Sequence, residues 1–69
     1  MDIKEFLKSE LKINLNEVAQ RMWPNNQHAK VLMSMKLKGT RQWTDDDTER
    51  AKAVLRELYT EGLSKLDTL

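Results

Sequence analysis

The sequence predicts an all-α fold, a compact bundle of four to five helices, on three observations. The chain has 69 residues, and only two glycines and one proline interrupt a composition rich in good helix formers. Apolar residues recur at the spacing of a helix face, whereas alternation with a period of two is almost absent. The length allows one small hydrophobic core. We therefore expect a single domain over residues 1–62 and a short C-terminal tail or arm over residues 63–69.

The first two helices are predicted from an apolar stripe and a capping residue. The stripe of an expected helix over residues 2–12 consists of Ile3, Phe6, Leu7 and Leu11. Asn14 then stands where an N-cap belongs, and Glu17 follows at the spacing of a capping box. A second helix is expected from Leu15 to about Met22, and Pro24 helps to end it.

The third helix is expected over residues 27–37. Residues 23–26 form the turn into it, with Asn25 or Asn26 as the N-cap, and Gly39 ends it in a left-handed conformation. Its packing residues are predicted to be Val31, Leu32, Met33 and Met35.

A fourth helix is predicted to begin after Thr44, which serves as its N-cap. Three aspartates follow in the first turn, where the helix dipole favours negative charge, and this position explains them better than a metal-binding loop does. The buried stripe is Ala51, Val54, Leu55 and Leu58. Gly62 is the expected end of the helix, and both tryptophans and most methionines are expected in the core.

Charge is distributed unevenly along the chain. Residues 20–43 contain none of the eleven acids, although the net charge is only +1. The basic residues of this segment are Arg21, Lys30, Lys36, Lys38 and Arg41. A basic centre between acidic ends suits a domain that places one face against a polyanion, so nucleic acid is the leading partner class. The alternative explanation is chance or local packing.

Three segments resemble the lambda-repressor and Cro-like helix-turn-helix family. They are residues 14–22 (NLNEVAQRM), residues 33–41 (MSMKLKGTR) and residues 51–55 (AKAVL). The resemblance implies motif helices over about residues 15–22 and 27–37, with the second one in the DNA major groove. Ala19 and Gly39 are twenty positions apart, four more than the resemblance implies. The extra residues either lengthen the turn, which the proline and asparagines favour, or extend the third helix by about one turn.

Candidate DNA-contacting residues follow from this placement. Counting forward from the turn gives Gln27 and His28 as base contacts, and counting back from Gly39 gives Lys30, Val31 and Ser34. Backbone amides beyond Gly39 are also expected to face a phosphate. The side chains expected to contact phosphates are Asn26, Lys36, Lys38, Thr40, Arg41 and Gln42. In the alternative interpretation, His28 is a surface or cap residue, the Ser34 hydroxyl bonds a preceding carbonyl, and the charges are solvated.

The expected function is sequence-specific binding of double-stranded DNA by a small transcriptional regulator. With one histidine, no cysteine and no glycine-rich phosphate loop, the sequence predicts neither an enzyme nor a cofactor or metal site. A helical protein-interaction module, such as an adaptor, an antitoxin-like partner or a phage inhibitor, is the alternative.

The sequence also gives expectations about assembly and location. Leu63, Leu66 and Leu69 form either an apolar arm that pairs two copies as a homodimer or a tail folded back on the domain. No segment has the length and apolar character of a membrane span, and the N-terminus lacks the order of a signal peptide. We expect a protein of the cytoplasm of a bacterial or phage-infected cell, with no small-molecule substrate.

Overall fold

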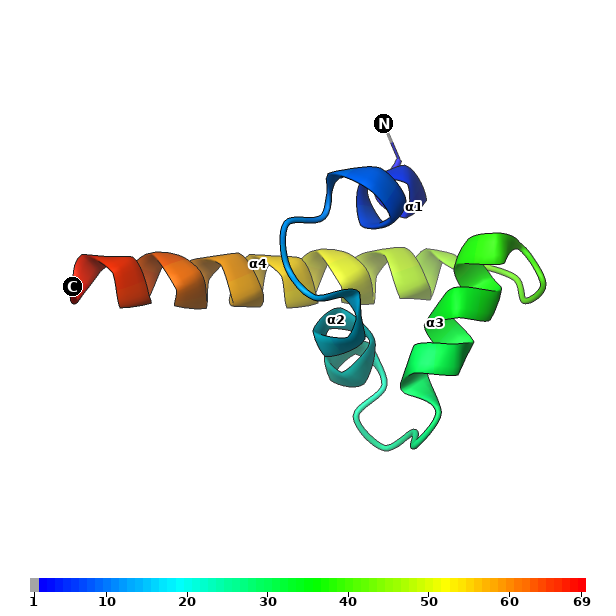
Figure 1. Ribbon diagram of the computed structural model, residues 1–69. Helices are drawn as coiled ribbons and strands as arrows, with labels where there is room; N and C mark the ends of the chain where they lie inside the picture. Colours follow the sequence, from blue (N-terminus) through cyan, green and yellow to red (C-terminus); the bar gives the residue numbers. More distant parts are fainter. Residues whose placement is uncertain (1) are drawn as a thin grey trace.

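The structure, a computed structural model, describes residues 2–69, which form helices and connecting turns without a strand. The elements in order are α1 (Ile3–Glu5), the π-helical η1 (Phe6–Glu10), α2 (Leu15–Met22), α3 (Ala29–Lys38) and α4 (Asp45–Asp67). In Figure 1, α4 is a long rod, α1 and α2 lie on opposite sides of its middle, and α3 lies near its beginning. The predicted all-α bundle is confirmed. Across residues 2–69, none of the helices has the combined length and apolarity needed to span a bilayer.

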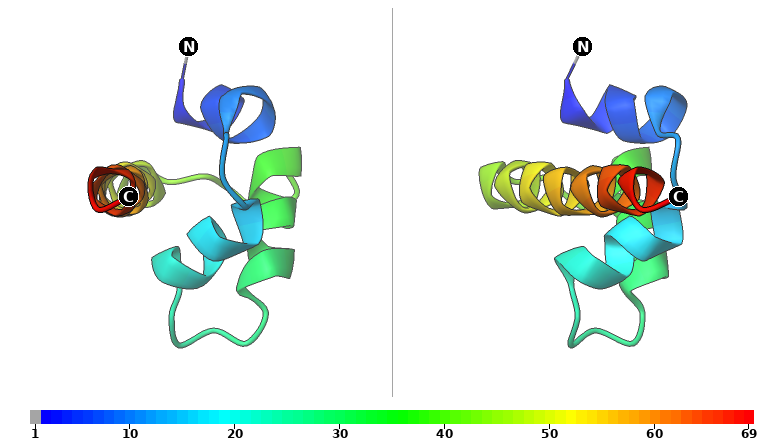
Figure 2. Two further views of the ribbon diagram at one scale, coloured as in Figure 1. Left: turned by 60° about the vertical axis from the view of Figure 1, so that its left-hand side comes forward. Right: turned by 90° about the vertical axis from the view of Figure 1, so that its left-hand side faces the viewer.

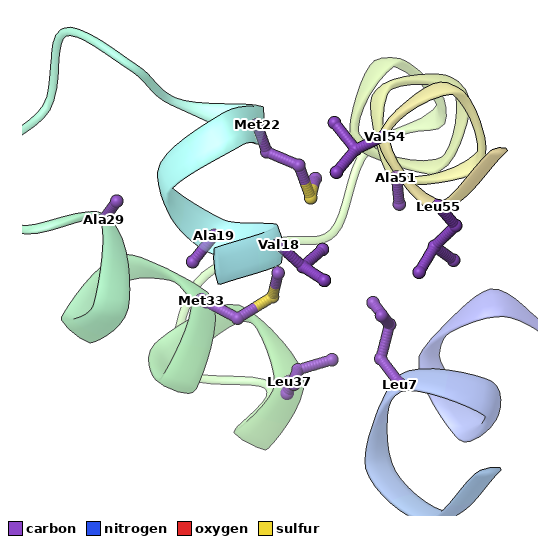
Figure 3. Close-up of a cluster of buried hydrophobic side chains, with 10 residues drawn as sticks. All are labelled: Leu7, Val18, Ala19, Met22, Ala29, Met33, Leu37, Ala51, Val54 and Leu55. Atoms are coloured by element: carbon purple, nitrogen blue, oxygen red, sulfur yellow. The ribbon is translucent and has the colours of Figure 1, made fainter. Parts of the chain in front are cut away.

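The core is formed by residues of η1, α3 and α4 packed around α2. Val18 and Ala19 of α2 have no exposed surface, and they lie between α3 on one side and α4 on the other (Figures 2 and 3). The small side chain of Ala19 lets α2 and α3 approach closely. The buried cluster is Leu7, Val18, Ala19, Met22, Ala29, Met33, Leu37, Ala51, Val54 and Leu55.

The first helix is shorter than predicted. Asp2 caps it, because its side chain accepts a hydrogen bond from a backbone amide three residues later. The chain then leaves the helix at Leu11, whose backbone is extended and whose side chain packs against the core. The backbone amide of Lys12 donates to the Tyr59 hydroxyl at 3.3 Å. The predicted helix over residues 2–12 is therefore cut short because the chain turns toward α4.

α2 has the bounds that the sequence predicts, and Asn14 caps it by accepting from the backbone amide of Asn16 at 2.8 Å. Glu17 does not complete the expected capping box. Its carboxylate lies 3.3 Å from the guanidinium of Arg21, one turn further along the same helix.

The extra residues lengthen the turn between α2 and α3, as the proline and the asparagines predict. The turn comprises residues 23–28, so α3 begins at Ala29 instead of residue 27. Neither predicted N-cap residue occupies the cap position, which falls on His28 and has no side-chain cap hydrogen bond. Asn26 acts earlier instead, since its side chain accepts from the backbone amide of His28 at 2.8 Å and closes the turn.

One predicted packing residue of α3 faces outward. Ala29, Met33 and Leu37 are four residues apart and form the buried side of the helix, so Val31 is turned away from the core and its side chain is 53% exposed. Met33 is buried as predicted, while Leu32 and Met35 are half-buried.

The end of α3 and the start of α4 follow the sequence closely. Gly39 takes the predicted left-handed conformation with φ of 88°. Thr44 caps α4: its hydroxyl accepts from the backbone amide of Asp47 at 3.1 Å, and the Asp47 side chain accepts from the backbone amide of Thr44 at 3.0 Å. The aspartate of the first turn thus completes a capping box.

The predicted end of α4 at Gly62 is wrong. The helix continues to Asp67, and Gly62 has no positive φ. A glycine inside a helix costs only about 1 kcal/mol relative to alanine, and the residues around this one are good helix formers. Residues 63–67 are therefore the last turns of α4, not a separate tail or arm.

Both tryptophans pack against the core, as predicted, and each is half-buried. The indole NH of Trp43 donates to the Thr48 hydroxyl at 2.8 Å, which ties the connection before α4 to its first turn. Trp23 lies at the end of α2, and its ring centre is 5.7 Å from Lys36 Nζ. The aromatic residues thus serve the packing between elements.

We expect Gly39→Ala to lower the free energy of unfolding by about 1 to 2 kcal/mol, because an L side chain is strained at a φ of 88°. Urea denaturation followed by circular dichroism measures this difference. Gly62→Ala is the matched control, since the surroundings of Gly62 are open and its backbone is helical. A Gly39→Ala variant as stable as the wild type would contradict the assignment of strain to this corner.

Candidate nucleic-acid interface

One face of α3 carries two lysines and a serine. Lys30, Ser34 and Lys38 are four residues apart, so they follow one another along the same side of the helix. Both lysines are exposed, Ser34 is half-buried, and the exposed Val31 lies at the edge of the same side. The base-contact candidates within α3 are therefore brought together.

A groove with a volume of about 480 Å³ runs beside this face, between α3, η1 and the start of α2. Its polar lining consists of Lys8, Asn16, Lys30, Ser34 and Lys38, and apolar side chains of the same elements complete it. Sequence reasoning missed Lys8 and Asn16. Their only signal in the sequence is a place on the polar side of a helix, which does not tell which neighbouring helix they face.

Gln27 and His28 lie outside this groove, in the turn before α3. Both are exposed and line a pocket of about 490 Å³ together with Arg50 and the rest of the turn. Gln27 and Lys30 also share a smaller hollow of about 440 Å³. Lys30 is thus the residue that connects the two sets of base-contact candidates.

The corner after α3 presents side chains but not backbone amides. The amides of Thr40 and Arg41 donate to the carbonyl of Met35 at 3.0 and 3.3 Å, and the amide of Gly39 donates to the carbonyl of Lys36 at 3.3 Å. The expectation that these amides face a phosphate is therefore wrong, because they complete the end of α3. The side chains of Thr40, Arg41 and Gln42 are exposed, and so is Asn26 in the turn at the other end of α3.

The structure removes Lys36 from the phosphate candidates. Its Nζ lies 2.5 Å from Oδ2 of Asp47 and donates to the carbonyl of Gln42 at 3.2 Å. The side chains of the two ion-pair partners are only 12% and 5% exposed. Lys36 therefore joins α3 to α4 and does not extend the surface.

Burial alone raises the pKa of the Asp47 carboxyl, but the hydrogen bonds from Lys36 and from the Thr44 backbone, with the charge of Lys36, outweigh it. The net effect lowers the pKa of Asp47 below its ordinary value. Asp47 is therefore ionised at neutral pH and supplies the counter-charge that Lys36 needs.

Arg21 is also engaged within the molecule. Its guanidinium bridges α2 to α4, at 2.6 Å from Glu57 and 3.2 Å from Glu61, and it pairs with Glu17 as well. The hydrogen bond with Glu61, with the charges of all three carboxylates, raises the pKa of Arg21 above its ordinary value. Arg21 thus neutralises acids of α2 and α4.

Three of the five basic residues of the central segment remain for a partner. Within residues 2–69, no ion pair involves Lys30, Lys38 or Arg41, and the same holds for Lys8 at the groove. These four cations lie on α3, on the corner that follows it and on η1. Their arrangement can attract a polyanion along the exposed side of α3.

Comparisons of the chain with models of protein families, with curated proteins and with solved structures find no match.

We expect Asp47→Asn to lower the free energy of unfolding at pH 7 by about 1 to 3 kcal/mol, because it leaves Lys36 without its counter-ion. The difference from the wild type should shrink as the pH falls below about 4. The pKa of Asp47 is lowered in the folded protein, so its ionised carboxylate stabilises the folded state at any pH above the pKa of the unfolded chain. This stabilisation is lost as the pH falls and the carboxylate of the folded protein is protonated.

Urea denaturation at a series of pH values tests this expectation. Asp46→Asn is the matched control, since Asp46 is exposed and pairs with Arg50 only on the surface of α4. Such a pair contributes about 0.5 kcal/mol or less. Equal losses in the two variants would contradict the role of Asp47.

Proposed function

We propose that this chain binds double-stranded DNA with α3 in the major groove. The observation that carries the proposal is the exposed side of α3, where Lys30, Ser34 and Lys38 follow one another and neither lysine forms an ion pair with any other of residues 2–69. An α-helix fits the major groove, and lysines and hydroxyls donate to base edges and phosphates there. The acid-free composition of residues 20–43 keeps repulsive charge away from this side.

The residues divide into those that read bases and those that hold phosphates. Lys30 and Ser34 at the middle of the face, with Gln27 and His28 in the turn, are assigned to base edges. The phosphate set is Asn26, Lys38, Thr40, Arg41 and Gln42. Lys8 and Asn16 join this set, because they line the groove on the side opposite α3.

The arrangement of α2 and α3 supports a regulatory role. A capped α2, a small Ala19 at the crossing and a second helix with a polar outer side resemble the layout of a helix-turn-helix. The role proposed here is therefore that of a small transcriptional regulator of a bacterial or phage-infected cell.

A protein-interaction module is the second candidate, and the groove beside α3 favours it. Apolar side chains of Leu15, Met33 and Leu37 contribute to its lining, and Val31 is exposed nearby. A helix of a partner protein could pack there. Lys30, Lys38 and Arg41, which form no ion pair within residues 2–69, favour DNA over this alternative.

Binding of the full chain to a pool of randomised DNA duplexes at two salt concentrations separates the candidates. Enrichment of a sequence motif, with affinity that falls as salt rises, supports a regulator. Salt-sensitive binding without a motif would leave an architectural role. No binding at low salt would replace the proposal with the protein-interaction module.

We expect Lys38→Ala and Arg41→Ala to weaken binding to all duplexes alike, each reducing the slope of log K against log salt by about one. Gln27→Ala and Lys30→Ala should instead relax the preference at particular bases, by about 1 to 3 kcal/mol. Fluorescence anisotropy with the enriched duplex and single-base variants of it measures both effects.

Lys65→Ala is the matched control for these variants. It removes the same charge from the far end of α4, away from α3 (Figure 1). Binding that drops as much in Lys65→Ala as in Lys38→Ala would mean that net charge alone is responsible. Uniform weakening by all four site variants would contradict the division into base-reading and phosphate-holding residues.

A further inference from the structure

The last turns of α4 extend beyond the rest of the molecule and expose apolar side chains. In Figure 1 the orange and red end of α4 projects past α1 and α2. Every residue from Thr60 onward is exposed. Leu63 and Leu66 are 63% and 65% exposed, and Leu69 is fully exposed. Three of the four large apolar side chains that are exposed within residues 2–69 thus lie on this one segment.

These side chains continue the core-facing stripe of α4 past the edge of the core. Leu55 is buried, Tyr59 one turn later is half-buried, and Leu63 and Leu66 follow at spacings of four and three residues. Leu66 is eleven residues, or about three turns, from Leu55 and lies on the same side of α4, and Leu63 lies at the edge of that side. Burying such a stripe against another helix removes apolar surface from water.

Two further features make this segment complementary to a second copy of itself. Gly62 lies beside the stripe, and the space around its Cα is open, so another helix can approach closely there. Arg56 and Asp67 are eleven residues apart, which is about three turns, so both lie on the same flank of α4. Within residues 2–69 neither has an ion-pair partner.

We propose that the ends of α4 from two copies of this chain pack against each other in antiparallel orientation. In the register centred between Gly62 and Leu63, Leu63 packs against Leu63 of the second copy. Leu66 then lies opposite Tyr59 of the second copy. Along the helix axis, Arg56 then lies two residues, or about 3 Å, from Asp67 of the second copy. The same flanks face each other in an antiparallel pair, so both Arg56–Asp67 pairs form at once.

The charges select the second copy, and this orientation, as the occupant. A parallel pair in equal register leaves Arg56 of one copy and Asp67 of the other about three turns apart along the axis, so neither pair of opposite charges forms. The antiparallel pair forms both. It also places the two bodies toward opposite ends of the paired segment, since the side chains buried in each core end at Leu55 of α4.

The test uses the full chain and two charge reversals. Arg56→Asp places two acids together in the antiparallel pair, and Asp67→Arg places two cations together. Each single variant should raise the dimer dissociation constant by about tenfold or more, whereas the double variant and an equimolar mixture of the two single variants should associate like the wild type. Both side chains are exposed, so unchanged helicity by circular dichroism checks that each variant folds.

Analytical ultracentrifugation over a concentration series measures the masses, with 8.1 kDa for the single chain. Leu66→Lys should also abolish the pair, because it puts an ammonium group into the apolar contact. A wild type that remains a single chain throughout would overturn the proposal. Single variants that associate as tightly as the wild type, or that gain nothing on mixing, would overturn the antiparallel register. None of these outcomes depends on DNA binding.

Discussion

The ion pair between Lys36 and Asp47 fixes the angle between α3 and α4. This angle in turn determines which side chains of α3 are exposed. Lys36 donates to the carboxylate and to the Gln42 carbonyl, and its ammonium group lies near the Trp23 ring at the end of α2. Asp47 in turn closes the capping box with Thr44. Withdrawing both charges from water is costly unless every partner is in place, so the corner has one conformation that satisfies them all.

The orientation of α3 about its own axis is a consequence of this constraint. With Lys36 directed at α4 and Met33 and Leu37 in the core, only the side bearing Lys30, Ser34 and Lys38 is left for solvent. Glu17 of α2 and Glu57 and Glu61 of α4 are gathered around Arg21. Lys36 and Arg21 are thus each engaged in an ion-pair network within the molecule. Of the five basic residues of the central segment, Lys30, Lys38 and Arg41 are left for the side that we propose for DNA, although the net charge of the chain is only +1.

Local chemistry made part of this structure predictable. α2, the cap at Thr44 and the left-handed Gly39 each depend on residues within a few positions, and all three were predicted correctly. The features that the sequence did not predict depend on contacts between residues far apart in the chain. The sequence gives no reason to separate Lys36 from Lys38, because the partner of Lys36 is eleven positions away and is reached only after the corner folds. Likewise, the side of the first helix that carries Lys8 could not be assigned to the groove before the helices were packed.

The two proposed surfaces lie at opposite ends of α4, and this separation limits how they can act together. From Asp45, near α3, to the proposed centre of pairing at Gly62 and Leu63 the helix rises about 26 Å. In an antiparallel pair the two α3 helices would therefore be about 50 Å apart along α4, more than the roughly 34 Å of one DNA turn. Such a pair does not match half-sites one turn apart. It instead suits two separate sites, on one duplex or on two, with the α4 ends as the spacer between them.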